Sequence, residues 1–242
     1  MLFSGVAMAL TGTLILFLTL QKLISNIKTP SCEGVFYSRS SFCGFAGPIR
    51  PVGVVPKCLL YALVKEESCE NLTGVTIPKT VTTIGDHAFY FCTKLTSIEF
   101  PASVTSIGDQ AFCDCDSLTS VTIGNGVTSI GYRAFYSCSG ITKVVISDIA
   151  AWCRISFGDY EANPLYFGKH LYLGENEITS LVIPEGVTSI GSYAFYRCTG
   201  LTSITIPSSV TSIGEDAFSW CTGLTSVTIG NGVTSISSSA FA

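Results

Sequence analysis

The chain repeats one pattern of hydrophobic and polar positions every 23 residues. In the block LTSITIPSSVTSIGEDAFSWCTG, which begins at Leu201, the apolar positions are 1, 4, 6, 10, 13, 17, 18 and 21. A fixed period of this size predicts a solenoid, in which each coil buries its apolar side chains by stacking on its neighbours. Similar blocks begin at Leu72, Leu95, Leu118, Ile178 and Leu224, and a partial block begins at Ile141.

Each block predicts two short strands and one helical turn. Positions 4 and 6 are apolar and alternate with Ser or Thr at positions 3 and 5, which is the period of a half-buried strand. Proline at position 7, as in Pro101 and Pro207, ends that strand, and positions 10 to 13 read as a second one. The Ala-Phe-x-x-Cys stretch predicts a helical turn whose Phe and Cys point inward. The predicted fold class is an α/β solenoid of short parallel strands and short helical turns.

The recurring string LxxIxIPxxVxxIGxxAFxxC resembles the BspA-type (treponemal-type) leucine-rich repeat, and it covers Leu72 to Phe241 apart from one interruption. The resemblance implies a right-handed leucine-rich repeat solenoid. Members of this family are common among surface proteins of bacteria and of some parasitic protists, and several are adhesins. The resemblance therefore implies a non-enzymatic, surface-associated protein that mediates protein–protein contact or cell adhesion, although fold alone fixes function only loosely.

The hydropathy of the chain predicts three regions. Residues 1–28 form a transmembrane anchor or signal segment, because Leu2 to Leu20 carry no charge and are long enough to cross a bilayer core of about 30 Å. Residues 29–71 form a junction with a degenerate capping repeat, and residues 72–242 form the solenoid. We expect the protein at the cell surface or secreted, with residues 2–20 as its membrane anchor if they are retained.

Composition excludes several function classes. The net charge of −4, with only 12% charged residues, argues against nucleic-acid binding, which needs a basic stripe. The two histidines, His87 and His170, have no second ligand type at metal spacing, and no G-x-S-x-G, H-E-x-x-H or phosphate-loop motif occurs. The sequence thus predicts no catalytic residue, no cofactor and no metal.

Cysteines recur in phase with the repeat, at position 21, and Cys69 keeps the same phase. A free cysteine behaves as a small buried hydrophobe, so we expect a ladder of core thiols. Cys32, Cys43 and Cys58 lie outside this ladder, and in an exported protein two of them could form a disulfide. The ladder positions are Cys92, Cys115, Cys138, Cys198 and Cys221.

The period breaks once, at residues 148–177. From Ile141 to Ile178 there are 37 residues instead of 23. Asp148 predicts the N-cap of a short helix, and the segments His170–Leu173 and Ile178–Ile183 predict a β-hairpin. Insertions in solenoids often lie on the binding face. The alternative is a bulge that packs its own aromatic side chains together.

Aromatic side chains are the best candidates for partner binding. Repeat positions 16, 19 and 20 should face outward, and exposed aromatics are typical of contact sites. The alternative is that they pack over neighbouring coils. The candidates are Tyr90, Phe91, Tyr136, Tyr193, Tyr196 and Trp220 in the repeats, and Trp152, Tyr160, Tyr166 and Tyr172 in the insert.

Threonine and serine occupy the outward strand positions, as in Thr96, Thr119, Thr202 and Thr225. Such ranks could form a flat polar platform for a protein or glycan. Thr and Ser also simply suit exposed strand positions, and we favour that interpretation.

The functional hypothesis is therefore a solenoid that binds a protein or glycan ligand, with membrane association through the N-terminal segment. The alternatives are a structural spacer and a truncated repeat fragment with no binding activity of its own. The last block ends at Ala242 without a polar cap, so Ile236 and Phe241 should be exposed. Truncation and end-to-end self-association would each explain that end.

Overall fold

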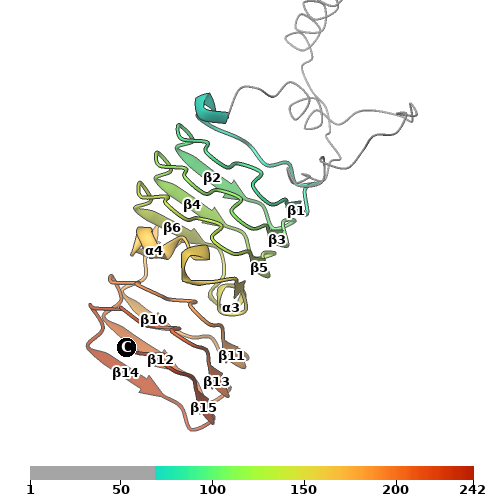
Figure 1. Cartoon of the computed structure of the whole chain (residues 1–242). Helices are drawn as coiled ribbons and strands as arrows, with labels where there is room; N and C mark the ends of the chain where they lie inside the picture. Colours follow the sequence, from blue (N-terminus) through green and yellow to red (C-terminus); the bar gives the residue numbers. More distant parts are fainter. Residues whose placement is uncertain (1–68) are drawn as a thin grey trace, which may run out of the picture. The chain divides into compact units, whose positions relative to one another are not determined.

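The computed structural model describes residues 69–242, which form a parallel-strand solenoid of about seven coils (Figure 1). Each regular coil adds one longer strand to one rank and one two-residue strand to a second rank. The predicted architecture of two strands per coil is confirmed. Residues 1–28, most of the 29–71 junction, and Cys32, Cys43 and Cys58 lie outside the described residues.

The longer strands pair in parallel, in register with the repeat. Ile98 faces Val121, and Val121 faces Val144, so equivalent residues of successive coils are direct neighbours. Residues at positions 4 and 6 are buried in most coils, as the alternation predicts. The strands are β2 (Ser97–Phe100), β4 (Ser120–Ile123), β6 (Lys143–Ile146), β8 (Leu171–Leu173) and β9 (Asn176–Glu177) in one sheet, and β10 (Ser180–Val182), β12 (Ser203–Ile206) and β14 (Ser226–Ile229) in another.

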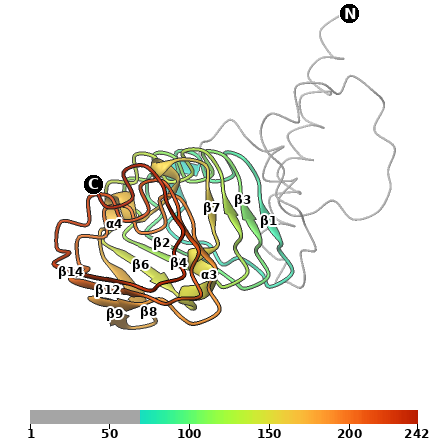
Figure 2. The ribbon, with the colours of Figure 1, turned by 90° about the horizontal axis from the view of Figure 1, so that it is seen from below.

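The two-residue strands form the second rank, seen for β1, β3 and β7 in Figure 2. Most are a Ser-Ile pair in which isoleucine points inward and serine points outward. They are β1 (Thr83–Ile84), β3 (Ser106–Ile107), β5 (Ser129–Ile130) and β7 (Ser156–Phe157), followed by β11 (Ser189–Ile190), β13 (Ser212–Ile213) and β15 (Ser235–Ile236).

The third side of each coil is a series of tight turns, so the predicted helical turn is wrong for the regular coils. Residues at positions 16 and 20 are left-handed, as in Tyr193 (φ 62°) and Arg197 (φ 59°), and this stops a helix from propagating. The N–H groups of positions 16, 18 and 20 instead donate to the next coil. Phe195 N donates to Ala217 O at 2.7 Å and Arg197 N donates to Ser219 O at 2.8 Å.

The core is one continuous column of repeated apolar side chains, and the Phe and Cys of every regular turn except the last are buried as predicted. Its phenylalanines stack from coil to coil. The ring of Phe112 lies 4.9 Å from that of Phe89 and 5.3 Å from that of Phe135, both nearly parallel. Phe218 stacks in the same way on Phe195 at 5.0 Å. A fully buried side chain of this size contributes about 1.5–3 kcal/mol, so the repetition itself stabilises the fold.

The break at residues 148–177 contains the helices of the solenoid body. Asp148 caps α3 (Ile149–Cys153) as predicted, because its side chain accepts from Ala151 N. The 3₁₀ helix η3 (Tyr160–Ala162) and the short helix α4 (Leu165–Gly168) follow. A separate 3₁₀ helix, η2 (Cys69–Asn71), opens the described region.

The predicted hairpin is present, but its second strand was placed wrongly. Strand β8 pairs antiparallel with β9, and Tyr172 faces Glu177. The turn between them holds Gly174, whose φ is +61°. Strand β10 instead begins the next parallel sheet by pairing with β12. The alternation of apolar residues continues from β8 into β10, so hydropathy alone could not show that the hairpin ends at β9.

Within residues 69–242, no helix is long and apolar enough to span a membrane.

Candidate functional site

Two side chains connect the break to the coil that follows it. In a regular coil, the carbonyl of the position-17 alanine accepts from a backbone N–H of the preceding coil, as Ala134 O does from Phe112 N. The equivalent carbonyl after the break, that of Ala194, accepts instead from Trp152 Nε1 at 2.8 Å and from Asn163 Nδ2 at 3.2 Å. Asn163 Nδ2 also donates to Tyr193 O at 2.7 Å. Side-chain donors thus replace the backbone donors that the insertion has displaced.

This arrangement removes Trp152 from the predicted contact surface. Its side chain is only 1% exposed and packs edge-on against Phe157, with ring centroids 5.4 Å apart. Asn163, which the sequence analysis did not single out, is fully buried, and its Oδ1 accepts from Leu165 N at 2.9 Å. The aromatic richness of the insert could not by itself separate a core tryptophan from an exposed tyrosine.

Four tyrosines gather on the outside of the break and form what we call the tyrosine surface: Tyr160, Tyr166, Tyr193 and Tyr196. The Tyr160 ring lies 5.6 Å from that of Tyr166 and 5.7 Å from that of Tyr196. The Tyr193 ring is 6.5 Å from that of Tyr160 and 6.3 Å from that of Tyr196, edge-on to each. The insert and the following coil thus contribute two tyrosines each. Their rings pack against one another, as the alternative interpretation expected, yet Tyr160 remains 41% exposed.

The tyrosine surface is bordered by charges of both signs. The guanidinium of Arg197 lies 4.7 Å from the ring centroid of Tyr166, which is a cation–π contact. The pKa of Tyr160 is raised by the carboxylate of Glu161 and then by burial, and burial raises the pKa values of Tyr193 and Tyr196. The phenols are therefore protonated near neutral pH and can donate hydrogen bonds.

A second aromatic and cationic group lies one coil earlier. The Arg133 guanidinium is 5.0 Å from the ring centroids of both Tyr132 and Tyr136, which are 44% and 38% exposed. Arg133 Nε also donates to Glu161 Oε2 at 2.9 Å, and Glu161 adjoins Tyr160 in η3. This ion pair links the second group to the tyrosine surface.

The remaining predicted aromatics lie elsewhere on the solenoid. Tyr90 and Phe91 contact each other in the first regular coil, with ring centroids 4.8 Å apart. Tyr172 lies on the strand rank, with Lys143 Nζ 5.0 Å from its ring. Trp220 is 59% exposed and stands in a regular coil. Partner binding by these residues stays a prediction.

Aliphatic side chains near the break were missed by the sequence analysis. Repeat position 5 is Thr or Glu in most coils, but it is Val145 before the break and Val182 after it. Within the break, Tyr172 of β8 is the strand neighbour of Val145. Val182 is 59% exposed and Leu173 is 39% exposed. Comparing each outward position down the repeats would have found this departure.

The threonine ranks are largely used within the solenoid. Thr202 Oγ1 donates to Thr179 O at 2.9 Å, and Thr225 Oγ1 donates to Thr202 O at 3.1 Å. The same bond recurs along the second rank, where Thr128 Oγ1 donates to Thr105 O at 3.0 Å. These hydroxyls stabilise neighbouring coils, which favours the interpretation of the ranks as structural.

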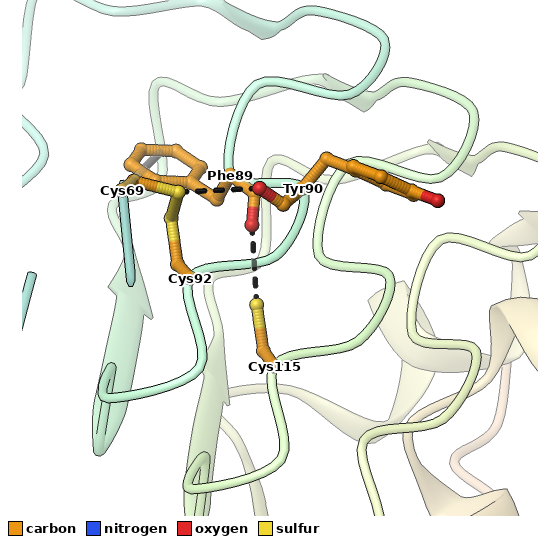
Figure 3. Close-up of a disulfide and its surroundings, with 5 residues drawn as sticks. All are labelled: Cys69, Phe89, Tyr90, Cys92 and Cys115. Carbon is orange, nitrogen blue, oxygen red and sulfur yellow. Dashed lines mark hydrogen bonds between the residues drawn. A yellow bond between two sulfur atoms is a disulfide. The ribbon is translucent and has the colours of Figure 1, made fainter. Parts of the chain in front are cut away.

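The cysteine ladder is buried, but its first step is a disulfide. Cys69 and Cys92, expected as free thiols, are bonded across adjacent coils with their Cα atoms 4.8 Å apart (Figure 3). Further along, Cys138 Sγ donates to Phe112 O at 3.0 Å and Cys221 Sγ donates to Phe195 O at 3.1 Å. Burial raises the pKa of Cys221 to about 12. The free ladder cysteines Cys115, Cys138, Cys198 and Cys221 are buried, as expected.

Neither the acidic and sulfur-bearing side chains nor the groove of the solenoid forms a built ligand site within the described residues. No group of three or more His, Cys, Asp or Glu side chains in residues 69–242 is arranged to hold a metal. An open groove of about 490 Å³ runs along the two-residue strands and includes Asp86, Asp109 and Tyr132. Its carboxylates already bind backbone: Asp86 Oδ1 accepts from Asp109 N, and Asp109 Oδ1 accepts from Tyr132 N.

Several solved structures of bacterial proteins are similar to this chain. TpLRR of T. pallidum is 25% identical, covering 68% of this chain and 72% of that one, with a TM-score of 0.44. A leucine-rich cell surface protein of Faecalibacterium prausnitzii is 31% identical over 67% of this chain and 33% of that one (TM-score 0.33). The pneumococcal vaccine antigen PcpA is 21% identical over 64% and 44% (TM-score 0.39). No match was found among curated proteins.

The TM-scores are low, so the family assignment rests on the repeat itself. The sequence model of the BspA type leucine rich repeat region matches residues 67–160 and 165–242, in 6 copies. These residues are most of the chain and coincide with the solenoid, and the short gap between the two matches falls within the break. The chain therefore belongs to the BspA-type leucine-rich repeat family.

Proposed function

We propose that the protein binds a protein partner through the tyrosine surface at the break of its solenoid. The observation that carries this proposal is the convergence of Tyr160 and Tyr166 from the insert with Tyr193 and Tyr196 from the next coil. Leucine-rich repeats commonly serve as scaffolds for protein interaction, and tyrosine and arginine are enriched among the residues that dominate binding energy.

The surface has the composition that favours a protein partner. Its rings supply a large contact area and are already held by one another, so little side-chain entropy is lost on binding. Its phenol groups and Arg197 supply donors for carbonyl and carboxylate oxygens. The exposed Val182 and Leu173 lie near the same break in the sequence and offer a further apolar contact.

We further propose that binding occurs outside the cell, as adhesion to another cell or its matrix. The apolar segment Leu2 to Leu20 supports export or anchoring. The Cys69–Cys92 disulfide supports an oxidising compartment, where such bonds persist. End-to-end self-association remains a second prediction. Size-exclusion chromatography over a range of concentrations tests it.

The test is a binding screen of the full chain against immobilised matrix proteins, with a glycan array beside it. We expect saturable binding to at least one protein, reduced at least tenfold in the double variant Tyr160→Ser/Tyr166→Ser. Circular dichroism checks that the variant is folded. Point substitutions are used because deleting the whole insert would also remove the core residues Trp152, Ala162 and Leu165.

Each other outcome contradicts the proposal in its own way. Binding only on the glycan array would identify a saccharide as the partner class. No binding on either array, with an intact fold, would favour a structural spacer. Unchanged protein binding by the double variant would indicate that the contact surface lies elsewhere on the solenoid.

A further inference from the structure

The N-terminal end of the cysteine ladder places three sulfur atoms in consecutive coils. Cys69, Cys92 and Cys115 share one repeat position, and the first two are bonded. Figure 3 shows the Cys115 side chain reaching toward the coil of Cys92, where its Sγ donates to Phe89 O at 3.2 Å. Stacked parallel strands are about 4.8 Å apart, so the next pair in the ladder has nearly the Cα separation of the bonded pair. That separation suits a disulfide.

We propose that Cys69, Cys92 and Cys115 form an internal thiol–disulfide exchange site, in which the bond moves from Cys69–Cys92 to Cys92–Cys115. The Cys115 sulfur gives up its proton and attacks Cys92 Sγ. The Cys92–Cys115 bond forms as the Cys69–Cys92 bond breaks, and the released Cys69 thiolate takes up a proton. No net oxidation occurs, so no external oxidant or reductant is required.

The solenoid supplies the geometry for this step. Exchange proceeds through a near-linear arrangement of the attacking, central and leaving sulfur atoms. Equivalent positions of three successive coils lie along one direction, the stacking direction. Cys92 lies in the middle, so its sulfur can bond to that of either Cys69 or Cys115.

The product state has an acceptor already positioned for the released thiol. Cys69 Sγ lies 3.2 Å from the carbonyl oxygen of Tyr90, which can accept the S–H of a released Cys69 (Figure 3). Cys115 uses Phe89 O in the same way before exchange. Phe89 O keeps a donor afterwards, because Cys92 N also donates to it at 3.2 Å. After exchange, Tyr90 O can accept from Cys69, and Phe89 O still accepts from Cys92 N.

Exchange changes the N-terminal end of the ladder most. Cys69 is only half-buried and lies in η2, at the start of the described region. Exchange therefore releases η2 from its covalent bond to the next coil and leaves a more accessible thiol at Cys69.

Mass spectrometry of the native full chain tests this proposal. Protein held at pH 8 without added thiol is quenched in acid, alkylated, cleaved with trypsin and mapped for disulfides. Cleavage after Lys79 and Lys94 places the three cysteines on separate peptides, and fragmentation separates Cys115 from Cys113. We expect both Cys69–Cys92 and Cys92–Cys115 peptides, with exchange about tenfold faster per pH unit because the thiolate is the nucleophile.

Matched variants make the outcome decisive. Cys115→Ser should leave only the Cys69–Cys92 bond, whereas Cys138→Ser should behave as the wild type. Cys69→Ser should form Cys92–Cys115 when glutathione disulfide is supplied. The proposal is overturned if the wild type shows the Cys69–Cys92 bond alone and folded Cys69→Ser keeps both remaining thiols free.

Discussion

The regular coil from Leu201 to Gly223 and the break at residues 148–177 are built by opposite means. The regular coil bonds to its neighbours through backbone groups on all three sides, with Thr202 Oγ1 adding one more bond to the preceding coil. The break replaces part of this ladder with the side chains of Trp152 and Asn163. Outward positions are mainly small and polar in the regular coil and aromatic at the break.

This difference separates stability from recognition. A coil that repeats its neighbour gains from the repetition, but it presents the same surface again and again. The break gives up backbone hydrogen bonds and gains a surface found nowhere else in the described residues. The break should therefore depend on its side chains as heavily as the regular coils depend on backbone hydrogen bonds.

The largest effect is expected for Trp152→Ala. It removes a fully buried side chain and leaves Ala194 O with one donor fewer, so the free energy of unfolding should fall by about 3–5 kcal/mol. Urea denaturation followed by circular dichroism measures this. Trp220→Ala, an exposed tryptophan of a regular coil, should change stability by less than about 0.5 kcal/mol. Equal losses for the two variants would contradict the assigned role of Trp152.

Asn163→Asp should destabilise the protein by about 2–3 kcal/mol at neutral pH. It removes the Nδ2 donor and places a carboxylate against the carbonyls of Tyr193 and Ala194. Burial raises the folded-state pKa of such a carboxylate, so the loss should shrink when both states are protonated below about pH 4. Thermal melts at pH 3.5 and pH 7 test this. A loss independent of pH would mean that packing, and not the donor, is what matters at Asn163.

Alkaline pH should affect the break and the regular coils alike, through Cys153 and Cys221. Burial raises the pKa of each thiol from 9.0 to about 12. Their protonated state favours the fold fully below pH 9, and this contribution is lost between pH 9 and 12. Each thiol then lowers the free energy of unfolding by about 1.4 kcal/mol per pH unit. Cys153→Ala and Cys221→Ala should each reduce the difference in stability between pH 8 and pH 10. A variant with undiminished alkaline sensitivity would show that its thiol is not protected by burial.

The smallest effect is expected in the threonine ranks. Thr202→Val keeps the side-chain shape and removes a 2.9 Å hydrogen bond to Thr179 O, at a cost of about 0.5–1 kcal/mol. Thr142→Val, beside the break, removes a longer bond of 3.4 Å to Thr119 O and should cost less. Denaturant midpoints of the two variants give the comparison. The reverse order would contradict the view that these ranks are structural mainly in the regular coils.

The regular coils could be predicted well because every local signal recurs. Alternation at positions 3 to 6 defined the longer strands, and the buried Phe and Cys followed from phase. The turn side was mispredicted because sequence reasoning does not reveal that residues such as Tyr193 and Arg197 adopt left-handed backbone. The Cys69–Cys92 bond was also missed, since equivalent cysteines in adjacent coils look the same whether bonded or free.

Only the location of the candidate site could be predicted from the sequence. The loss of period marked the break and its aromatics, but it did not show which rings would meet. Tyr160 and Tyr196 come together because η3 and the following coil pack side by side, and Trp152 turns inward because Ala194 O needs a donor. Both outcomes depend on contacts between residues 36 or more positions apart, which no local pattern carries.

The central claim is that the break, and not the regular coil, carries partner binding. Its most direct test compares the affinity of Tyr160→Ser/Tyr166→Ser with that of Trp220→Ser, for the matrix protein that the wild-type chain binds in the screen. We predict at least a tenfold weaker Kd for the double variant and a change of less than twofold for Trp220→Ser. A loss confined to Trp220→Ser, or an equal loss in both variants, would contradict the claim.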